Sequence, residues 1–73
     1  MKTAERMFLD LGYRIECSSS TFIEYIKDED NIITFNSRMK RFCKSTENGE
    51  VSYIREEELK AINKQISELG WYI

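Results

Sequence analysis

Short polar breaks divide the middle of the chain into segments too close together for anything but antiparallel pairing. The breaks are a serine run at 18–20, an acidic run at 28–30, residues 37–39 and Asn48-Gly49. Parallel neighbours need a crossover of about a dozen residues, which none of these breaks provides. Between the breaks, apolar and polar residues alternate as in half-buried strands. The sequence therefore predicts a β-meander with strands at 13–17, 21–27, 31–36, 40–46 and 50–54.

A helical period flanks this meander on both sides, at residues 3–11 and 56–69. Apolar residues recur in both stretches at spacings of three and four, which gives each predicted helix one hydrophobic stripe. Both stretches end in a leucine, a glycine and an aromatic residue, at Leu11-Gly12-Tyr13 and Leu69-Gly70-Trp71. A glycine at this position predicts the same left-handed C-terminal cap in both helices.

The turns also predict which side chains share a face of the sheet. A two-residue turn at Asn48-Gly49, a loop at 37–40, a tight acidic turn and a three-residue serine loop all give compatible registers. They place one set on the face that we expect the helices to cover: Tyr13, Ile15, Cys17, Ile23, Tyr25, Ile33, Phe35, Phe42, Val51 and Tyr53. The expected fold is a single α+β domain over residues 1–73, a helix, an antiparallel β-meander of four to five strands and a helix, with both helices on one face of the sheet.

Composition excludes several kinds of chemistry. The chain has 73 residues, 13 acidic, 11 basic, two cysteines and no histidine. Without histidine there is no His-based catalytic triad, no His-ligated zinc and no histidine pH switch. The two cysteines form neither a zinc site nor a disulfide framework, so we expect no metal and no cofactor.

The N-terminal stretch does not read as a signal peptide, because Arg6 and Asp10 interrupt the segment that would have to be apolar. No stretch approaches the roughly 18 apolar residues that a membrane-spanning helix needs. We therefore expect a cytoplasmic protein that does not contact a membrane.

Surplus apolar residues are the first candidate for a functional surface. The face opposite the helices is expected to be mostly polar, yet it keeps five apolar side chains, namely Phe22, Ile26, Ile32, Cys43 and Ile54. Such a group can form a homodimer interface or a docking site for a protein partner. Scattered exposed apolar residues are also normal on a monomer, which is the competing interpretation.

The C-terminal tail is the second candidate, because Trp71 and Tyr72 are large aromatic residues beyond the helix. Aromatic anchors dominate many protein interfaces. The competing interpretation is that the tail folds back and closes one end of the core.

Charge is the third candidate, since residues 31–49 carry four basic residues against one acidic residue. Arg38, Lys40 and Arg41 could contact the phosphates of a nucleic acid, whereas Lys44 is expected to face the helices. An acidic protein with one basic loop is more often simply solvated there, so nucleic-acid binding ranks below protein binding. Residues 28–31 are rich in oxygen ligands but lack the glycine and distal glutamate of a calcium loop, which favours an ordinary acidic hairpin turn.

The cysteines do not suggest catalysis. Cys17 and Cys43 are expected on opposite faces of the sheet, Cys17 in the core and Cys43 exposed beside Arg41. No base stands near either thiol in the pattern, so we expect no catalytic nucleophile and no enzyme activity.

Motifs at the two ends of the chain carry one further indication. They are Met1-Lys2-Thr3-Ala4-Glu5, Phe8 and Leu11-Gly12-Tyr13, then Leu59-Lys60-Ala61-Ile62-Asn63-Lys64-Gln65-Ile66 and Leu69-Gly70-Trp71. With these motifs the chain resembles small uncharacterised proteins of Gram-positive bacteria and their phages or prophages. The resemblance covers the two helices, about a third of the chain. It implies an intracellular, non-enzymatic accessory role in a phage or mobile-element setting, and assigns no functional residues.

Overall fold

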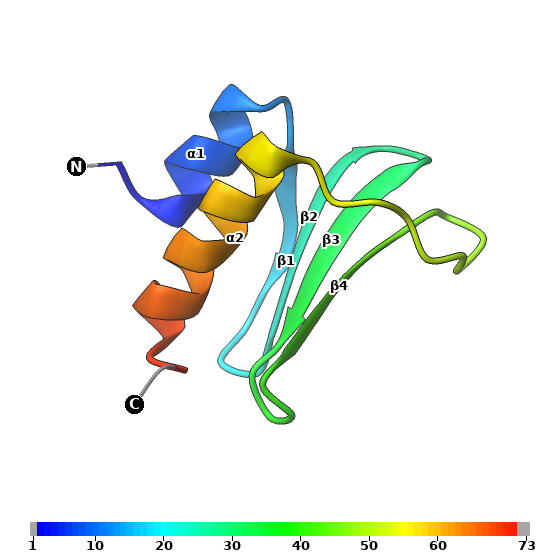
Figure 1. Cartoon of the computed structure of the whole chain (residues 1–73). Coiled ribbons are helices and arrows are strands. Elements are labelled where there is room, and N and C mark those ends of the chain that lie inside the picture. The colour runs from blue at the N-terminus through cyan, green and yellow to red at the C-terminus, as the bar shows by residue number, and fades with distance from the viewer. Residues whose placement is uncertain (1, 72–73) are drawn as a thin grey trace.

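The computed structural model describes residues 2–71 and confirms the predicted order of elements (Figure 1). The elements are α1 (Ala4–Asp10), β1 (Arg14–Ser18), β2 (Phe22–Asp28), β3 (Asn31–Asn36), β4 (Arg41–Ser45) and α2 (Glu56–Leu69). The strands form one antiparallel sheet in the order β1-β2-β3-β4. Both helices lie on one face of this sheet, as expected, and leave the other face without a helix.

Both helices end in the same cap, as their Leu-Gly-aromatic endings predict. Gly12 and Gly70 have positive φ angles of 95° and 75°. The backbone N–H of Tyr13 donates to the carbonyl of Phe8 at 2.9 Å, and that of Trp71 donates to the carbonyl of Ile66 at 3.2 Å. This bond, from the aromatic residue after the glycine to the last turn of the helix, is the mark of a Schellman cap.

The core lies between the two helices and the two central strands. Phe8 of α1 stacks on Tyr25 of β2 with ring centroids 4.0 Å apart, and meets Phe35 of β3 edge-on at 6.1 Å. Ile33 and Ile62 are fully buried beside these rings. Offset and edge-on aromatic pairs contribute about 0.5–1.5 kcal/mol each beyond the area that they bury.

The registers of the three C-terminal strands are confirmed. Ile26 pairs with Ile32 and Tyr25 with Ile33 across the acidic turn. Phe35 pairs with Phe42 across the loop at 37–40. These strands therefore present the predicted side chains to the helices, and their alternate residues to the opposite face.

The predicted register of β1 is wrong. The serine loop was expected to pair Ile15 with Ile23, but Ile15 pairs with Tyr25, and a β-bulge follows before Cys17 pairs with Glu24. The extra residue in the bulge reverses the alternation, so Cys17 lies on the face opposite the helices and is exposed. Cys17 is therefore not a core residue, and both cysteines lie on the same face of the sheet.

The predicted fifth strand does not form. Residues 50–54 make only an isolated bridge, Val51 with Ser45, whereas the two-residue turn at Asn48-Gly49 would pair Val51 with Thr46. The N–H of Gly49 donates to the carbonyl of Thr46, which makes the turn longer than expected. Because a shift of one residue exchanges the two faces, Val51 leaves the helix side and is 89% exposed.

Three other residues that were expected on the helix-covered face are more exposed than predicted. Ile15 and Phe42 lie on the helix side but on the two edge strands, where they are 36% and 38% exposed. Tyr53, in the segment that leads to α2, is 93% exposed. On these edge strands Ile15 and Phe42 are only partly enclosed, whereas Lys44, the other helix-facing residue of β4, is buried.

We expect Gly70→Ala to lower the free energy of unfolding by about 1 kcal/mol, because alanine is strained in the left-handed conformation that the cap requires. Gly70→Asn should cost less, since asparagine tolerates this conformation. Urea denaturation followed by circular dichroism measures both. Equal costs for the two substitutions would contradict the assigned cap.

Candidate functional site

The sheet face opposite the helices, here called the open face, is covered by neither helix (Figure 1). Its side chains form three rows across the strands. The first row is Arg14, Ile26, Ile32 and Ser45; the middle row is Cys17, Glu24, Thr34 and Cys43; the last row is Phe22, Asn36 and Arg41. Polar residues fill most of it, as expected for an antiparallel sheet with one solvated face.

Apolar side chains concentrate in the first row. Ile26 and Ile32 are cross-strand neighbours, and Val51 extends this row through its bridge to Ser45. Ile26 and Ile32 form the apolar floor of a hollow of about 340 Å³, which Arg14, Asp28, Glu29 and Glu47 also line. An apolar floor with a charged rim is suited to receive an apolar side chain from a partner.

The structure brings together most of the predicted interaction residues. Phe22, Ile26 and Ile32 lie half-buried on the open face, and Cys43 lies exposed beside them, with its thiol 3.2 Å from the hydroxyl of Thr34. Ile54 does not join them, because residues 50–54 form no strand. Val51 takes its place on this face.

The tail residues are not part of the open face. Trp71 packs against the core, with its ring centroid 6.3 Å from that of Phe35. This agrees with the interpretation that the tail closes one end of the core. Tyr72 lies outside the described residues.

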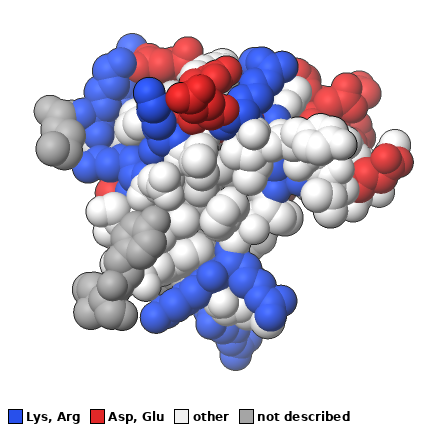
Figure 2. Space-filling model, in the orientation of Figure 1, with Lys and Arg blue, Asp and Glu red and all other residues white. Residues whose placement is uncertain are grey.

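Positive charge gathers at one end of the sheet. Arg38 and Lys40 are exposed on the turn between β3 and β4, and Arg41 follows in the last row of the open face. Figure 2 shows this basic group at the bottom of the molecule, away from the acidic residues at the right. Lys44 is absent from it, because its side chain is buried on the helix side as predicted.

Negative charge gathers at the opposite end. The turn at 28–30 and the loop at 46–50 lie side by side there, tied by a hydrogen bond of 2.7 Å from the N–H of Glu47 to the carbonyl of Glu29. They form an acidic hollow of about 160 Å³. One end of the open face is thus basic, and the other is acidic on balance, with Arg14 as a cation among its carboxylates.

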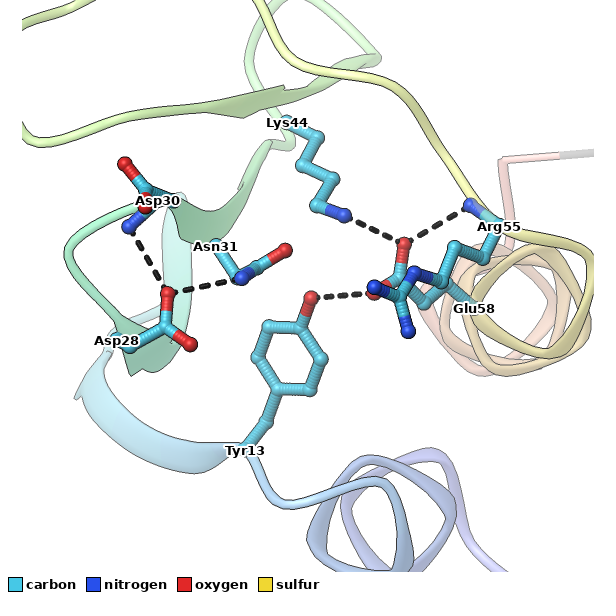
Figure 3. Close-up of polar contacts among 7 residues, drawn as sticks. All are labelled: Tyr13, Asp28, Asp30, Asn31, Lys44, Arg55 and Glu58. Atoms are coloured by element: carbon cyan, nitrogen blue, oxygen red, sulfur yellow. Dashed lines mark hydrogen bonds and ion pairs between the residues drawn. The ribbon is translucent and has the colours of Figure 1, made fainter.

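The acidic turn is held by its own hydrogen bonds. Asp28 accepts from the N–H of Asp30 at 2.9 Å and from the side-chain amide of Asn31 at 2.8 Å (Figure 3). These bonds, the Asn31 bond first, hold the pKa of Asp28 below its usual value. Within residues 2–71 no three metal-ligating side chains converge. The geometry is that of an Asx turn.

A buried carboxylate, Glu58, joins three parts of the fold (Figure 3). One of its oxygens accepts hydrogen bonds from the Lys44 ammonium at 2.8 Å and from the Arg55 backbone N–H at 3.0 Å. The other accepts from the Tyr13 hydroxyl at 2.6 Å. The side chains of Lys44 and Glu58 are only 2% and 4% exposed.

This buried cluster is not poised for acid-base catalysis. Burial by itself would raise the pKa of Glu58, but the hydrogen bonds from Arg55, Lys44 and Tyr13 outweigh it and hold that pKa below its ordinary value of 4.5. Burial and the bond to Glu58 raise the pKa of Tyr13 far above its usual value. A carboxylate that three hydrogen bonds hold in its ionised form serves structure better than proton transfer.

Sequence reasoning missed Val51 and the partner of Lys44. The face on which Val51 lies depends on the length of the turn, which the Asn48-Gly49 pair does not determine. Glu58 is one of three consecutive glutamates in the first turn of α2, and no local pattern distinguishes it from the other two. A signal for it did exist, because a lysine predicted to face the core requires a buried carboxylate.

No protein-family model matches the chain, and neither a curated protein nor a solved structure is similar to it. The resemblance of the two helices to small proteins of Gram-positive bacteria and their phages or prophages therefore stays a prediction. Within residues 2–71, every helix falls short of the length and apolar character needed to cross a membrane.

We expect Tyr13→Phe to cost about 1–3 kcal/mol of unfolding free energy, because it removes a hydrogen bond to a buried carboxylate. It should also flatten the acid dependence. The lowered pKa of Glu58 stabilises the fold above about pH 4.5, and this contribution is lost as the pH falls through the folded value. Without Tyr13 the shift is smaller, so less stability is lost as the pH falls below about 4.5.

Tyr25→Phe is the matched control, since Tyr25 donates to the neutral amide oxygen of Gln65 at 2.6 Å. It should cost about 1 kcal/mol and leave the acid dependence as in the wild type. Urea denaturation at several pH values measures both. Identical pH profiles for the two variants would contradict the role given to Tyr13.

Proposed function

We propose that this chain is a protein-interaction module that binds a protein partner through the open face. The observation that carries the proposal is the hollow over Ile26 and Ile32, an apolar floor with a charged rim on an uncovered sheet. Two free cysteines suit a reducing compartment such as the cytoplasm. A non-enzymatic accessory role in a phage or mobile element remains part of this proposal.

The edges of the sheet are less suited to a partner than its face. β1 is interrupted by its bulge and carries the exposed pair Arg14 and Glu16, 3.3 Å apart. Bulges and charged side chains are the usual means of preventing edge-to-edge pairing. Part of the β4 edge is occupied, because Ser52 N–H donates to the carbonyl of Lys44. The face then offers the larger continuous surface.

A photo-crosslinking residue tests this proposal directly. We expect p-benzoylphenylalanine at position 22, an aromatic replacement on the open face, to form a protein adduct in cells. The substitution Ile32→Glu should abolish this adduct. The same probe at position 59 is the control, since Leu59 is 44% exposed on α2. Equal adducts from both positions, or none from position 22, would overturn the proposal. Circular dichroism confirms that each variant is folded.

The alternative function is nucleic-acid binding through Arg38, Lys40 and Arg41. These three cations do lie together at one end of the open face. The acidic end lies on the same surface, however, and would repel a phosphate backbone that runs along the strands.

We therefore expect no mobility shift of single-stranded or double-stranded DNA or RNA at low salt, where phosphate contacts are strongest. A shift that Arg38→Glu with Lys40→Glu removes would favour the nucleic-acid function instead.

A further inference from the structure

We infer that the partner on the open face is a second copy of this chain, stacked face to face with its strands antiparallel. The inference rests on the proposed function and adds the identity and orientation of the partner. Two features carry it: the opposite net charges at the two ends of the face and the position of Phe22 relative to the hollow.

The charges at the two ends are complementary. One end carries Arg38, Lys40 and Arg41. The other carries the acidic residues of the turn at 28–30 and of the loop at 46–50, which are Asp28, Glu29, Asp30, Glu47 and Glu50. Figure 2 shows the two groups apart on the molecule. A chain with a net charge of only −2 thus carries, on one surface, both halves of an electrostatic contact.

A two-fold axis that lies between the two sheets and runs across the strands brings the basic and the acidic end of each copy into contact with the other copy at the same time. Such an axis places each strand over its own counterpart with its direction reversed. The basic end of each copy then lies over the acidic end of the other, and the contact is made twice, as in an isologous dimer. An axis parallel to the strands would instead place like charges together.

The same axis matches apolar groups. Phe22 lies on β2 in the last row, and Ile26 lies on the same strand in the first row. With β2 over its reversed counterpart, Phe22 of each copy lies over the hollow formed by Ile26 and Ile32 of the other. An aromatic side chain in an apolar hollow, with opposite charges at the rim, is the typical core of an interface.

The middle row lies on the axis, so its residues face their own counterparts. Glu24 then opposes a second Glu24, which weakens the dimer through like-charge repulsion. Cys43 opposes a second Cys43. Packed sheets are about 10 Å apart, too far for a disulfide but within reach of a short bis-maleimide that joins the two thiols.

The size of the face predicts a weak dimer. Four strands at about 4.8 Å and lengths of five to seven residues give a flat footprint of roughly 400 Å² per copy. This is at the low end for specific assemblies, so we expect a Kd in the micromolar range or weaker. Dimerisation should weaken further as salt screens the two ends.

Sedimentation velocity of the purified full chain, from micromolar to millimolar concentration, tests the inference. We expect reversible dimers that Ile32→Glu weakens at least about tenfold and that Glu24→Gln strengthens. Leu59→Glu, on the helix side, is the matched control and should leave dimerisation unchanged. In a Cys17→Ser background, the bis-maleimide should join Cys43 to Cys43 across the dimer.

Reversing the charge of one end of the face at a time is the decisive part of the experiment. Arg38→Glu with Lys40→Glu makes both ends acidic, and Glu29→Lys with Glu47→Lys and Glu50→Lys makes both ends basic. Each variant alone should dimerise about tenfold more weakly, because both of its contacts join like charges. In a mixed dimer each of the two contacts joins an acidic end to a basic end, so mixing the two variants should restore association. A monomer at every concentration, or no association on mixing, overturns the inference.

The outcomes separate the two proposals. If the purified chain is monomeric but position 22 still forms an adduct in cells that Ile32→Glu abolishes, the open face binds a different protein and only the inferred second copy is wrong. If position 22 forms no adduct either, the proposed function fails with it.

Discussion

The Glu58 carboxylate is the contact on which the arrangement of this small domain depends. It accepts hydrogen bonds from the side chains of Lys44 and Tyr13 and from the backbone of Arg55. These donors belong to β4, to the segment that enters β1 and to the start of α2. A buried ion pair contributes little net stability once desolvation is counted, but breaking one partner is costly. If β4 shifted by one residue, Lys44 would turn outward and leave Glu58 buried without its cation.

The composition of the open face follows from this contact. With Lys44 turned toward α2, the alternate residues of β4 must point outward, which places Arg41, Cys43 and Ser45 on the open face. Arg41 then adds to the basic end, and Ser45 guides Val51 to the apolar row through their bridge. The register of β4 that Glu58 fixes therefore also determines which side chains lie on the surface that we propose as an interface.

The sequence predicts the helices and the three C-terminal strands well, because each is encoded in a local pattern. Apolar spacings define α1 and α2, and the short turns align Ile26 with Ile32 and Phe35 with Phe42. It predicts the strand β1 but not its register, because a single-residue bulge leaves the alternation of residue types unchanged while reversing the faces beyond it. Cys17 is misplaced for this reason.

Two other features need information that is not local. The turn around Asn48-Gly49 includes Thr46, and only the observed hydrogen bond from Gly49 reveals it. That difference moves Val51 to the open face and leaves Ile54 outside the sheet. The pairing of Lys44 with Glu58 joins residues 14 positions apart on different elements. An inward-facing lysine predicts a buried carboxylate partner, but the sequence contains several glutamates and does not indicate which of them it is.

The central claim is that molecules of this chain meet through the face that Glu58 leaves open. Methyl NMR spectra of the purified protein over a range of concentrations test it most directly. The account predicts that the methyl signals of Ile26, Ile32 and Val51 shift together as the concentration rises, while those of Leu9 and Leu59 on the helices stay fixed. Spectra that do not change with concentration, or shifts confined to the helix methyls, would contradict it.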